Sequence, residues 1–145
     1  MKAADQTIVD KITGDCTRAC IASMLDLEID AVPHFARFED KRFRSDMWFR
    51  VMTSFLKEFG YKYFGTGWVL SEDRPHGQIL NESPNINGFV MATVQSRTFE
   101  GVGHSVVMNL EGLVVHDPNP NRLWQGINVI ETKDLQHWMM IGENE

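Results

Sequence analysis

The order of its predicted elements places this chain in the α+β class, with helices in the first half and an antiparallel sheet in the second. Apolar residues recur at helical spacing before residue 60, whereas short runs rich in Val, Ile and Phe follow residue 87. A length of 145 residues, without repeats or linkers, predicts a single domain that spans residues 1–145.

Two helices are predicted in the first half of the chain. The first runs from Asp15 to about Leu27, and Asp15 is expected to be its N-cap, because a carboxylate accepts the free N–H groups of the first turn. The second runs from Ser45, its N-cap, to Gly60. An apolar stripe along this second helix is expected to pack in the core, and it consists of Trp48, Phe49, Met52, Phe55, Leu56 and Phe59.

The second half is expected to form four strands, at residues 88–95, 103–110, 113–117 and 127–131. Between the two halves, residues 71–87 form a long polar stretch that contains prolines and glycine. Connections of this length often carry function. The stretch is therefore a candidate for shaping access to a substrate, and a purely structural loop is the alternative.

Composition and charge argue against several classes of partner. The net charge of −6 would repel nucleic acid and anionic membranes, and the basic group Lys41, Arg42 and Arg44 is too short to reverse this. No apolar run approaches the ~18 residues of a membrane span. The first 14 residues lack the apolar core of a signal peptide. With only two cysteines, a disulfide framework is not expected, and a reducing compartment, the cytoplasm, is predicted.

Cys16 is the candidate nucleophile. It falls in the first turn of the first predicted helix, where unpaired N–H groups and the helix dipole stabilise an anion and lower the pKa of a thiol. The thiolate is the reactive form of a catalytic cysteine. Cys20 lies one turn further along the same helix face and is expected to pack in the core as a small apolar residue.

A hairpin in the second half supplies a candidate base and acid. If Glu111 and Gly112 are the two central residues of a tight turn, Val106 lies opposite Asp117. His104 shares the face of Val106, because side chains on a strand alternate. His104 and Asp117 are then diagonal neighbours within reach of an imidazole–carboxylate hydrogen bond, as in a Cys–His–Asp triad.

A zinc site is the alternative use of the same residues. Its four ligands would be Cys16, Cys20, His104 and His116. The two histidines are expected on opposite faces of the sheet, whereas zinc requires four ligands that converge tetrahedrally. No metal is therefore predicted, and no organic cofactor either.

The segments that carry Cys16 and His104 resemble a known family. GDCTRACIASMLDLEIDAVPHF and GHSVVMNLEGLVVHDPNPNRLW together resemble the papain-like cysteine peptidases, in particular the small C39-peptidase-like proteins of bacteria and phages. The two segments cover about a third of the chain. The resemblance implies a papain-like fold, with N-terminal helices packed on a C-terminal antiparallel sheet. It assigns the nucleophile to Cys16, the base to His104 and the third member of the triad to Asp117.

The resemblance also implies an oxyanion hole with one departure from the family pattern. The family places a glutamine six residues before the nucleophile, where its amide acts with the backbone N–H of the cysteine. Here that position holds Asp10, whose carboxylate would repel an oxyanion, and the nearest glutamine is Gln6. Gln6 and the Cys16 backbone N–H are therefore the candidate donors.

Together these residues predict a cysteine hydrolase that cleaves a peptide or isopeptide bond through an acyl-enzyme intermediate. Its partner would be a peptide or protein. An acyltransferase or a deamidase on the same triad is an alternative, as is a catalytically weak domain that binds peptides or proteins. The sequence leaves open the substrate, the source and the oligomeric state.

Overall fold

The computed structural model describes residues 1–9, 14–34, 47–70, 72 and 75–144. Two α-helices come first, α1 (Cys16–Met24) and α2 (Met47–Glu58). Five strands follow, and they are β1 (Tyr61–Gly67), β2 (Phe89–Gln95), β3 (Gly103–Asn109), β4 (Val114–His116) and β5 (Leu135–Glu143). Three short 3₁₀ helices complete the described elements, η1 (Ile29–Ala31), η3 (Leu80–Glu82) and η4 (Val129–Glu131).

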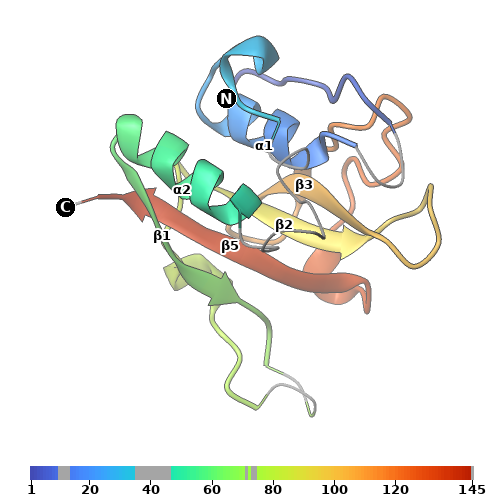
Figure 1. Ribbon diagram of the computed structural model, residues 1–145. Helices are drawn as coiled ribbons and strands as arrows, with labels where there is room; N and C mark the ends of the chain where they lie inside the picture. Colours follow the sequence, from blue (N-terminus) through green and yellow to red (C-terminus); the bar gives the residue numbers. More distant parts are fainter. Residues whose placement is uncertain (10–13, 35–46, 71, 73–74, 145) are drawn as a thin grey trace.

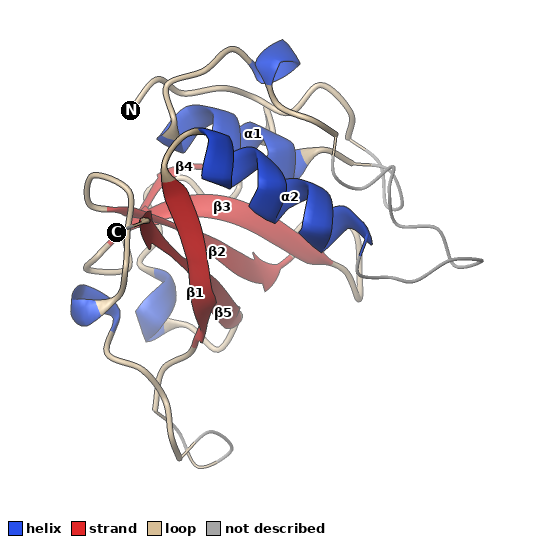
Figure 2. Ribbon diagram, turned by 60° about the vertical axis from the view of Figure 1, so that its left-hand side comes forward, coloured by secondary structure: helices blue, strands red, loops and turns tan. Residues whose placement is uncertain are grey.

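The strands form one sheet in the order β1-β5-β2-β3-β4, with every neighbouring pair antiparallel. Both helices lie on the same face of this sheet (Figures 1 and 2). The predicted α+β class is therefore confirmed. Among the described residues, none of the helices has the length and apolar character needed to cross a membrane.

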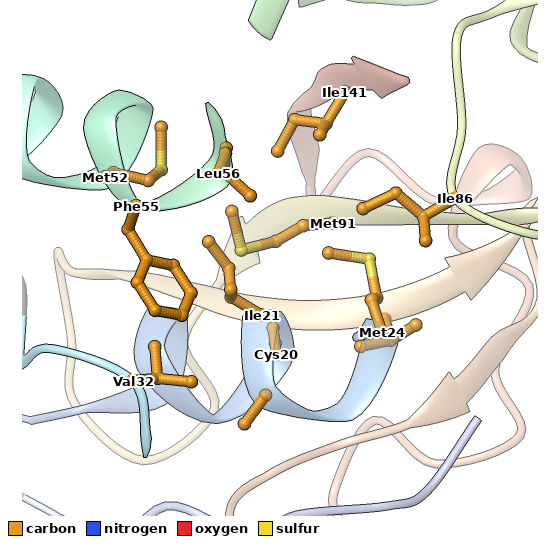
Figure 3. Packing of buried hydrophobic residues seen from close by; sticks show 12 residues of the cluster. Cys20, Ile21, Met24, Val32, Met52, Phe55, Leu56, Ile86, Met91 and Ile141 are labelled. Carbon is orange, nitrogen blue, oxygen red and sulfur yellow. The ribbon is translucent and has the colours of Figure 1, made fainter. Parts of the chain in front are cut away.

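Two apolar clusters cover the two faces of the sheet, because successive side chains on a strand point to opposite sides. The first lies between the helices and the sheet, where Ile21 of α1 and Leu56 of α2 approach Met91 of β2 (Figure 3). The second lies on the other face, and Trp124 and Trp138 are its largest members. The prediction that Cys20 packs in the core is confirmed, since it is 0% exposed.

The helices differ from the prediction at their ends. The first ends at Met24 rather than near Leu27, and Asp26 follows with a φ of 57°, which lies outside the helical region. The second ends before Gly60, as predicted, and the φ of +83° at this glycine suits a helix C-terminus. The predicted cap Ser45 lies outside the described residues, as do Lys41, Arg42 and Arg44.

Asp15 holds the predicted N-cap position of α1, but its predicted role as a side-chain cap is wrong. Its side chain makes no capping hydrogen bond. Instead, the carboxylate accepts hydrogen bonds from the backbone N–H groups of Thr7 and Ile8, each at 2.9 Å. The N-terminal segment thus supplies the donors that the first turn of the helix was expected to supply.

The predicted stripe on α2 packs in the core at Met52, Phe55 and Leu56, whereas Phe59 is 43% exposed. We expect Leu56→Ala to lower the free energy of unfolding by about 2–5 kcal/mol, because it leaves a cavity in a fully buried site. Urea unfolding followed by circular dichroism measures the loss. The exposed neighbour Lys57 provides the control, and Lys57→Ala is expected to change the value by no more than about 0.5 kcal/mol. Equal losses in both variants would contradict this account of the core.

Three of the four predicted strands are present, and the fourth is wrong. Residues 127–131 form the 3₁₀ helix η4, and only a single bridge joins Asn128 to Leu113. The side chain of Asn128 accepts a hydrogen bond from the Ile130 N–H and so turns the chain away from an extended path. The strands β1 and β5, which pair with each other, were not predicted.

The turn between β3 and β4 also differs from the prediction. It is built on Asn109, whose side-chain oxygen accepts from the N–H groups of Glu111 and Leu113, and Gly112 has a φ of +92°. This turn shifts the pairing by one residue, so that Met108 lies opposite Val114. A bulge in β4 then restores the predicted register, and Val107 lies opposite His116. The next residue, Asp117, consequently lies on the side where the prediction placed it.

Candidate active site

Cys16 is the first residue of α1 and lies beside the start of β3. Its Sγ accepts a hydrogen bond from the backbone N–H of Ser105, with a distance of 3.5 Å. The hydroxyl groups of Thr17 and Ser105 are 3.0 Å apart and join the first turn of the helix to the same strand. The thiol therefore lies where the helix N-terminus favours an anion and where β3 adds a further N–H donor.

His104, the second residue of β3, links Cys16 to Asp117. Its Nε2 is 2.7 Å from Asp117 Oδ1, and its ring also forms a hydrogen bond with the Cys16 side chain. Because Nε2 faces the carboxylate, Nδ1 is the ring nitrogen that remains for the thiol. The structure thus brings the three predicted residues into one hydrogen-bonded chain. The side chains of His104 and Asp117 are only 11% and 1% exposed, so water competes little for these bonds.

The Asp117 carboxylate is held by the loop that follows β4. Its Oδ2 accepts from the Trp124 N–H at 2.9 Å, and its Oδ1 accepts from the Asn119 N–H at 3.0 Å. The Asp117 N–H in turn donates to Gln125 Oε1 at 2.8 Å. A carboxylate with this many donors has one orientation, and that orientation fixes the imidazole of His104.

The pKa values of the thiol and the imidazole move in opposite directions. Burial raises the pKa of Cys16, but the hydrogen bond and charge of His104, with the Ser105 N–H, outweigh this effect and leave the pKa below its ordinary value. Burial lowers the pKa of His104, but the hydrogen bond of Asp117 and those with Cys16 raise it to about 9. Both shifts favour the form of the pair in which a thiolate lies beside an imidazolium.

The two remaining ionisable groups at the site support the same charge arrangement. Burial raises the pKa of Asp117, but hydrogen bonds from His104 and from the Trp124 N–H outweigh it, so the carboxyl stays ionised. Burial and the neighbouring charges of Cys16 and Asp117 raise the pKa of Cys20 well above its usual value. The pKa shifts therefore favour a thiolate at Cys16 and a neutral thiol at Cys20.

A small cavity of about 80 Å³ opens beside the thiol. Cys16, His104 and Gln6 line it, together with Gly103 and side chains of the β2–β3 loop, namely Ser96, Thr98, Phe99 and Val102. The predicted oxyanion donor Gln6 is thus at the site, and its side chain is 7% exposed. Asp10, the residue at the family's usual glutamine position, lies outside the described residues.

Several features of the site had no signal in the sequence. Asn119 lines the cavity and also donates its backbone N–H to Asp117, but Asn-Pro sequences are common in turns. The Ser105 N–H reaches the thiol from a strand, where most N–H groups pair only with neighbouring strands. The β2–β3 loop forms the rim of the cavity, and its residues carry no distinctive motif.

The expectation that residues 71–87 shape access to the site is not met by the described part of this segment. None of the described residues of 71–87 lines the cavity beside Cys16. Those at Pro84, Asn85 and Asn87 instead border a separate hollow of about 470 Å³ against β1 and β5, which contains neither Cys nor His. This part of the chain packs on the face of the sheet opposite the helices. There Ser83 accepts a hydrogen bond from Trp138 Nε1 at 3.0 Å.

The zinc alternative does not fit the side chains. His116 Nε2 is 2.7 Å from the carbonyl oxygen of Ala4, a partner that a zinc ligand would give up. Cys20 is a fully buried core residue. Within the described ranges, no three His, Cys, Asp or Glu side chains converge as a metal-binding group.

Comparisons with family models, with curated proteins and with solved structures find no match for this chain.

Proposed function

We propose that this protein is a cysteine hydrolase of the papain-like type, which cleaves a peptide or isopeptide bond through Cys16, His104 and Asp117. One observation carries the proposal: a helix-start thiol of lowered pKa is hydrogen-bonded to an imidazole whose other nitrogen is 2.7 Å from a buried carboxylate. Buried pairs with opposite pKa shifts are typical of nucleophile and base in acyl transfer.

The reaction follows from the charges at rest. The Cys16 thiolate attacks the carbonyl carbon, and the electron pair of the C=O bond moves onto its oxygen. As the tetrahedral species collapses, the C–N bond breaks and the His104 imidazolium gives its proton to the leaving amine. The product of this half is a thioester on Cys16, with His104 now neutral.

Water completes the cycle. Neutral His104 takes a proton from a water molecule whose oxygen attacks the thioester carbon. The C–S bond breaks, the acid leaves and the thiolate–imidazolium pair is restored. An amine in place of water would give an acyltransferase, and a primary amide as substrate would give a deamidase, with the same residues in the same roles.

Two donors are proposed for the oxyanion. The backbone N–H of Cys16 has no acceptor within its own helix, because it belongs to the first turn. Gln6 lines the same cavity, and its side-chain amide has two N–H groups, one of which donates to the Ile8 carbonyl. The second N–H is the proposed donor.

The proposed substrate is a peptide or protein that presents a small group to the cavity of about 80 Å³. The net charge of −6 disfavours nucleic acid as a partner. Both cysteines are free thiols, and Cys16 must remain reduced to act, which favours the cytoplasm as the location. The triad itself requires neither metal nor organic cofactor.

The test is covalent capture of the acyl-enzyme. Wild-type protein is mixed with an activated ester such as p-nitrophenyl acetate, and peptide mapping by mass spectrometry locates the acyl group. The proposal expects a burst of nitrophenol, one acyl group on Cys16 and none on buried Cys20. A mixture of peptides then serves to find a cleaved sequence. Absence of a burst, with a thiol that reacts as an ordinary one, would favour the peptide-binding alternative.

A further inference from the structure

We propose that Asp15 is a positioning residue that holds the oxyanion donor Gln6 beside Cys16. This inference rests on the proposed function, because it gives Asp15 a part in the same reaction. It concerns a buried carboxylate, 1% exposed, that the mechanism above does not use.

The carboxylate of Asp15 binds one short piece of chain. Its Oδ1 accepts from the backbone N–H groups of Thr7 and Ile8, each at 2.9 Å. Its Oδ2 accepts from the Thr7 hydroxyl at 2.7 Å, and Arg18 Nη1 lies 3.5 Å from the same oxygen. Three of these four contacts are therefore made to the two residues that directly follow Gln6.

The Ile8 carbonyl connects this clamp to Gln6. It accepts the Asp15 backbone N–H at 3.2 Å and the Gln6 side-chain Nε2 at 2.8 Å. Gln6 Oε1 has no hydrogen-bond partner among the described residues, so the Ile8 carbonyl is the described contact that aims this buried amide. A displacement of Ile8 would therefore shift or release the Gln6 amide in the cavity that Cys16 also lines.

A second anchor ties the same segment to the acid end of the triad. The Gln6 backbone N–H donates to the carbonyl of Pro118, the residue after Asp117, at 2.9 Å. The N-terminal segment consequently lies beside the loop after β4 (Figure 1). Asp15 is adjacent to Cys16, and Pro118 is adjacent to Asp117. Gln6 is therefore attached to both ends of the proposed triad.

The test separates two reactions of Cys16. Alkylation by iodoacetamide requires only the thiolate, whereas acylation by p-nitrophenyl acetate also requires stabilisation of an oxyanion. We expect Asp15→Ala to slow acylation at least about 10-fold, up to the ~10²–10³ expected for Gln6→Ala. Alkylation is expected not to slow, since the thiolate is held by His104 and Ser105.

Conservative variants distinguish positioning from charge. Asp15→Asn keeps one oxygen that can accept the Thr7 and Ile8 N–H groups, so acylation is expected to recover to within about threefold of wild type. In the Gln6→Ala background, Asp15→Ala is expected to slow acylation no further, because residues that act as a unit are not additive. Asp30→Ala is the control, because exposed Asp30 is the other carboxylate near Arg18, at 3.8 Å, and is expected to leave both rates unchanged.

Several outcomes would overturn the inference. One is acylation of Asp15→Asn that is as slow as that of Asp15→Ala. Another is a double variant, Asp15→Ala with Gln6→Ala, whose loss of acylation is the sum of the two single losses. The third is an Asp15→Ala variant whose alkylation slows as much as its acylation. If Asp15→Ala does not fold, Asp15→Glu replaces it, since it keeps the charge but displaces the oxygens, and it is expected to slow acylation as well.

The same experiment separates this inference from the proposed function. If wild-type protein alkylates at Cys16 but is not acylated, the hydrolase proposal fails. The position of Gln6 is then read by NMR, where its side-chain amide protons are expected to exchange with solvent at least about 10-fold faster in Asp15→Ala than in Asp15→Asn. Equal exchange in the two variants would overturn the positioning role whatever the activity.

Discussion

Replacing His104 by alanine is expected to slow alkylation of Cys16 by iodoacetamide about 10- to 100-fold near pH 6.5. The hydrogen bond and charge of His104 are the largest of the effects that lower the pKa of Cys16, while burial opposes them. Without the imidazole, only the Ser105 hydrogen bond and the helix N-terminus oppose burial, and the pKa is expected to return to about 8.5 or above. A thiol with that pKa is about 1% thiolate near pH 6.5, which sets the size of the loss.

The pH dependence of alkylation and turnover follows from the range in which the thiolate–imidazolium pair exists. In wild type, the thiolate–imidazolium pair exists above the lowered pKa of Cys16 and below the pKa of His104, about 9. Turnover is therefore expected to fall at the alkaline end near pH 9, where His104 loses its proton. In His104→Ala, alkylation is expected to follow a single rise near or above pH 8.5.

The measurement is the alkylation rate of each cysteine between about pH 5 and 9.5, by quenched labelling and peptide mapping. Buried Cys20 provides an internal control, because it is expected to react only after unfolding. Exposed His76 provides the control substitution, and His76→Ala is expected to leave the profile of Cys16 unchanged. If His104→Ala has the same profile as wild type, the imidazole does not stabilise the thiolate and the triad is abandoned.

Asp117→Asn is expected to lower kcat/KM on the order of 10²–10⁴-fold. The carboxylate orients the imidazole and stabilises its charge through the 2.7 Å contact with Nε2. An amide has no charge, so the pKa of His104 falls from about 9 toward its ordinary value. The alkaline limit of turnover is expected to move down with it, which a simple loss of folding would not produce.

A second readout concerns the loop after β4. Asp117 accepts N–H groups from both Trp124 and Asn119, and an amide offers only one acceptor oxygen. The variant therefore leaves a donor without a partner, which is expected to lower the free energy of unfolding by about 1–3 kcal/mol. Glu111→Gln, an exposed change on the same hairpin, is the control and is expected to change neither quantity. A normal pH limit in Asp117→Asn would show that the carboxylate does not act through His104.

Local patterns were sufficient for much of the fold. The apolar stripe of α2 and its end before Gly60 follow from helical periodicity and from the conformational freedom of glycine. The strands β2 and β3 follow from runs of β-branched and apolar residues, and they lie within one residue of the predicted bounds. Each of these elements has a side-chain pattern that is visible within its own residues.

Elements without such a pattern were missed or misread. Tyr61–Gly67 contains two glycines and becomes a strand because it pairs with β5, about 75 residues later in the chain. The segment Ile127–Glu131 has the composition of a strand, but no neighbour pairs with it beyond one bridge, and Asn128 turns it into a 3₁₀ helix. Strand formation depends on partners, and distant partners are not visible in a local window.

By itself, the sequence determined which residues are the candidates for the chemistry: a thiol at a helix start and a histidine and an aspartate on one face of a hairpin. These depend on short-range geometry, namely the first turn of a helix and the alternation of strand side chains. Only the tertiary structure decided how these residues meet. The bulge in β4 restored the register that places Asp117 by His104. The Asp15 carboxylate accepted the N–H groups of Thr7 and Ile8 rather than those of its own helix, and Gln6 lines the same cavity as Cys16. The reason is physical, because a buried carboxylate takes whichever N–H donors packing brings to it, and those donors lie outside its own helix.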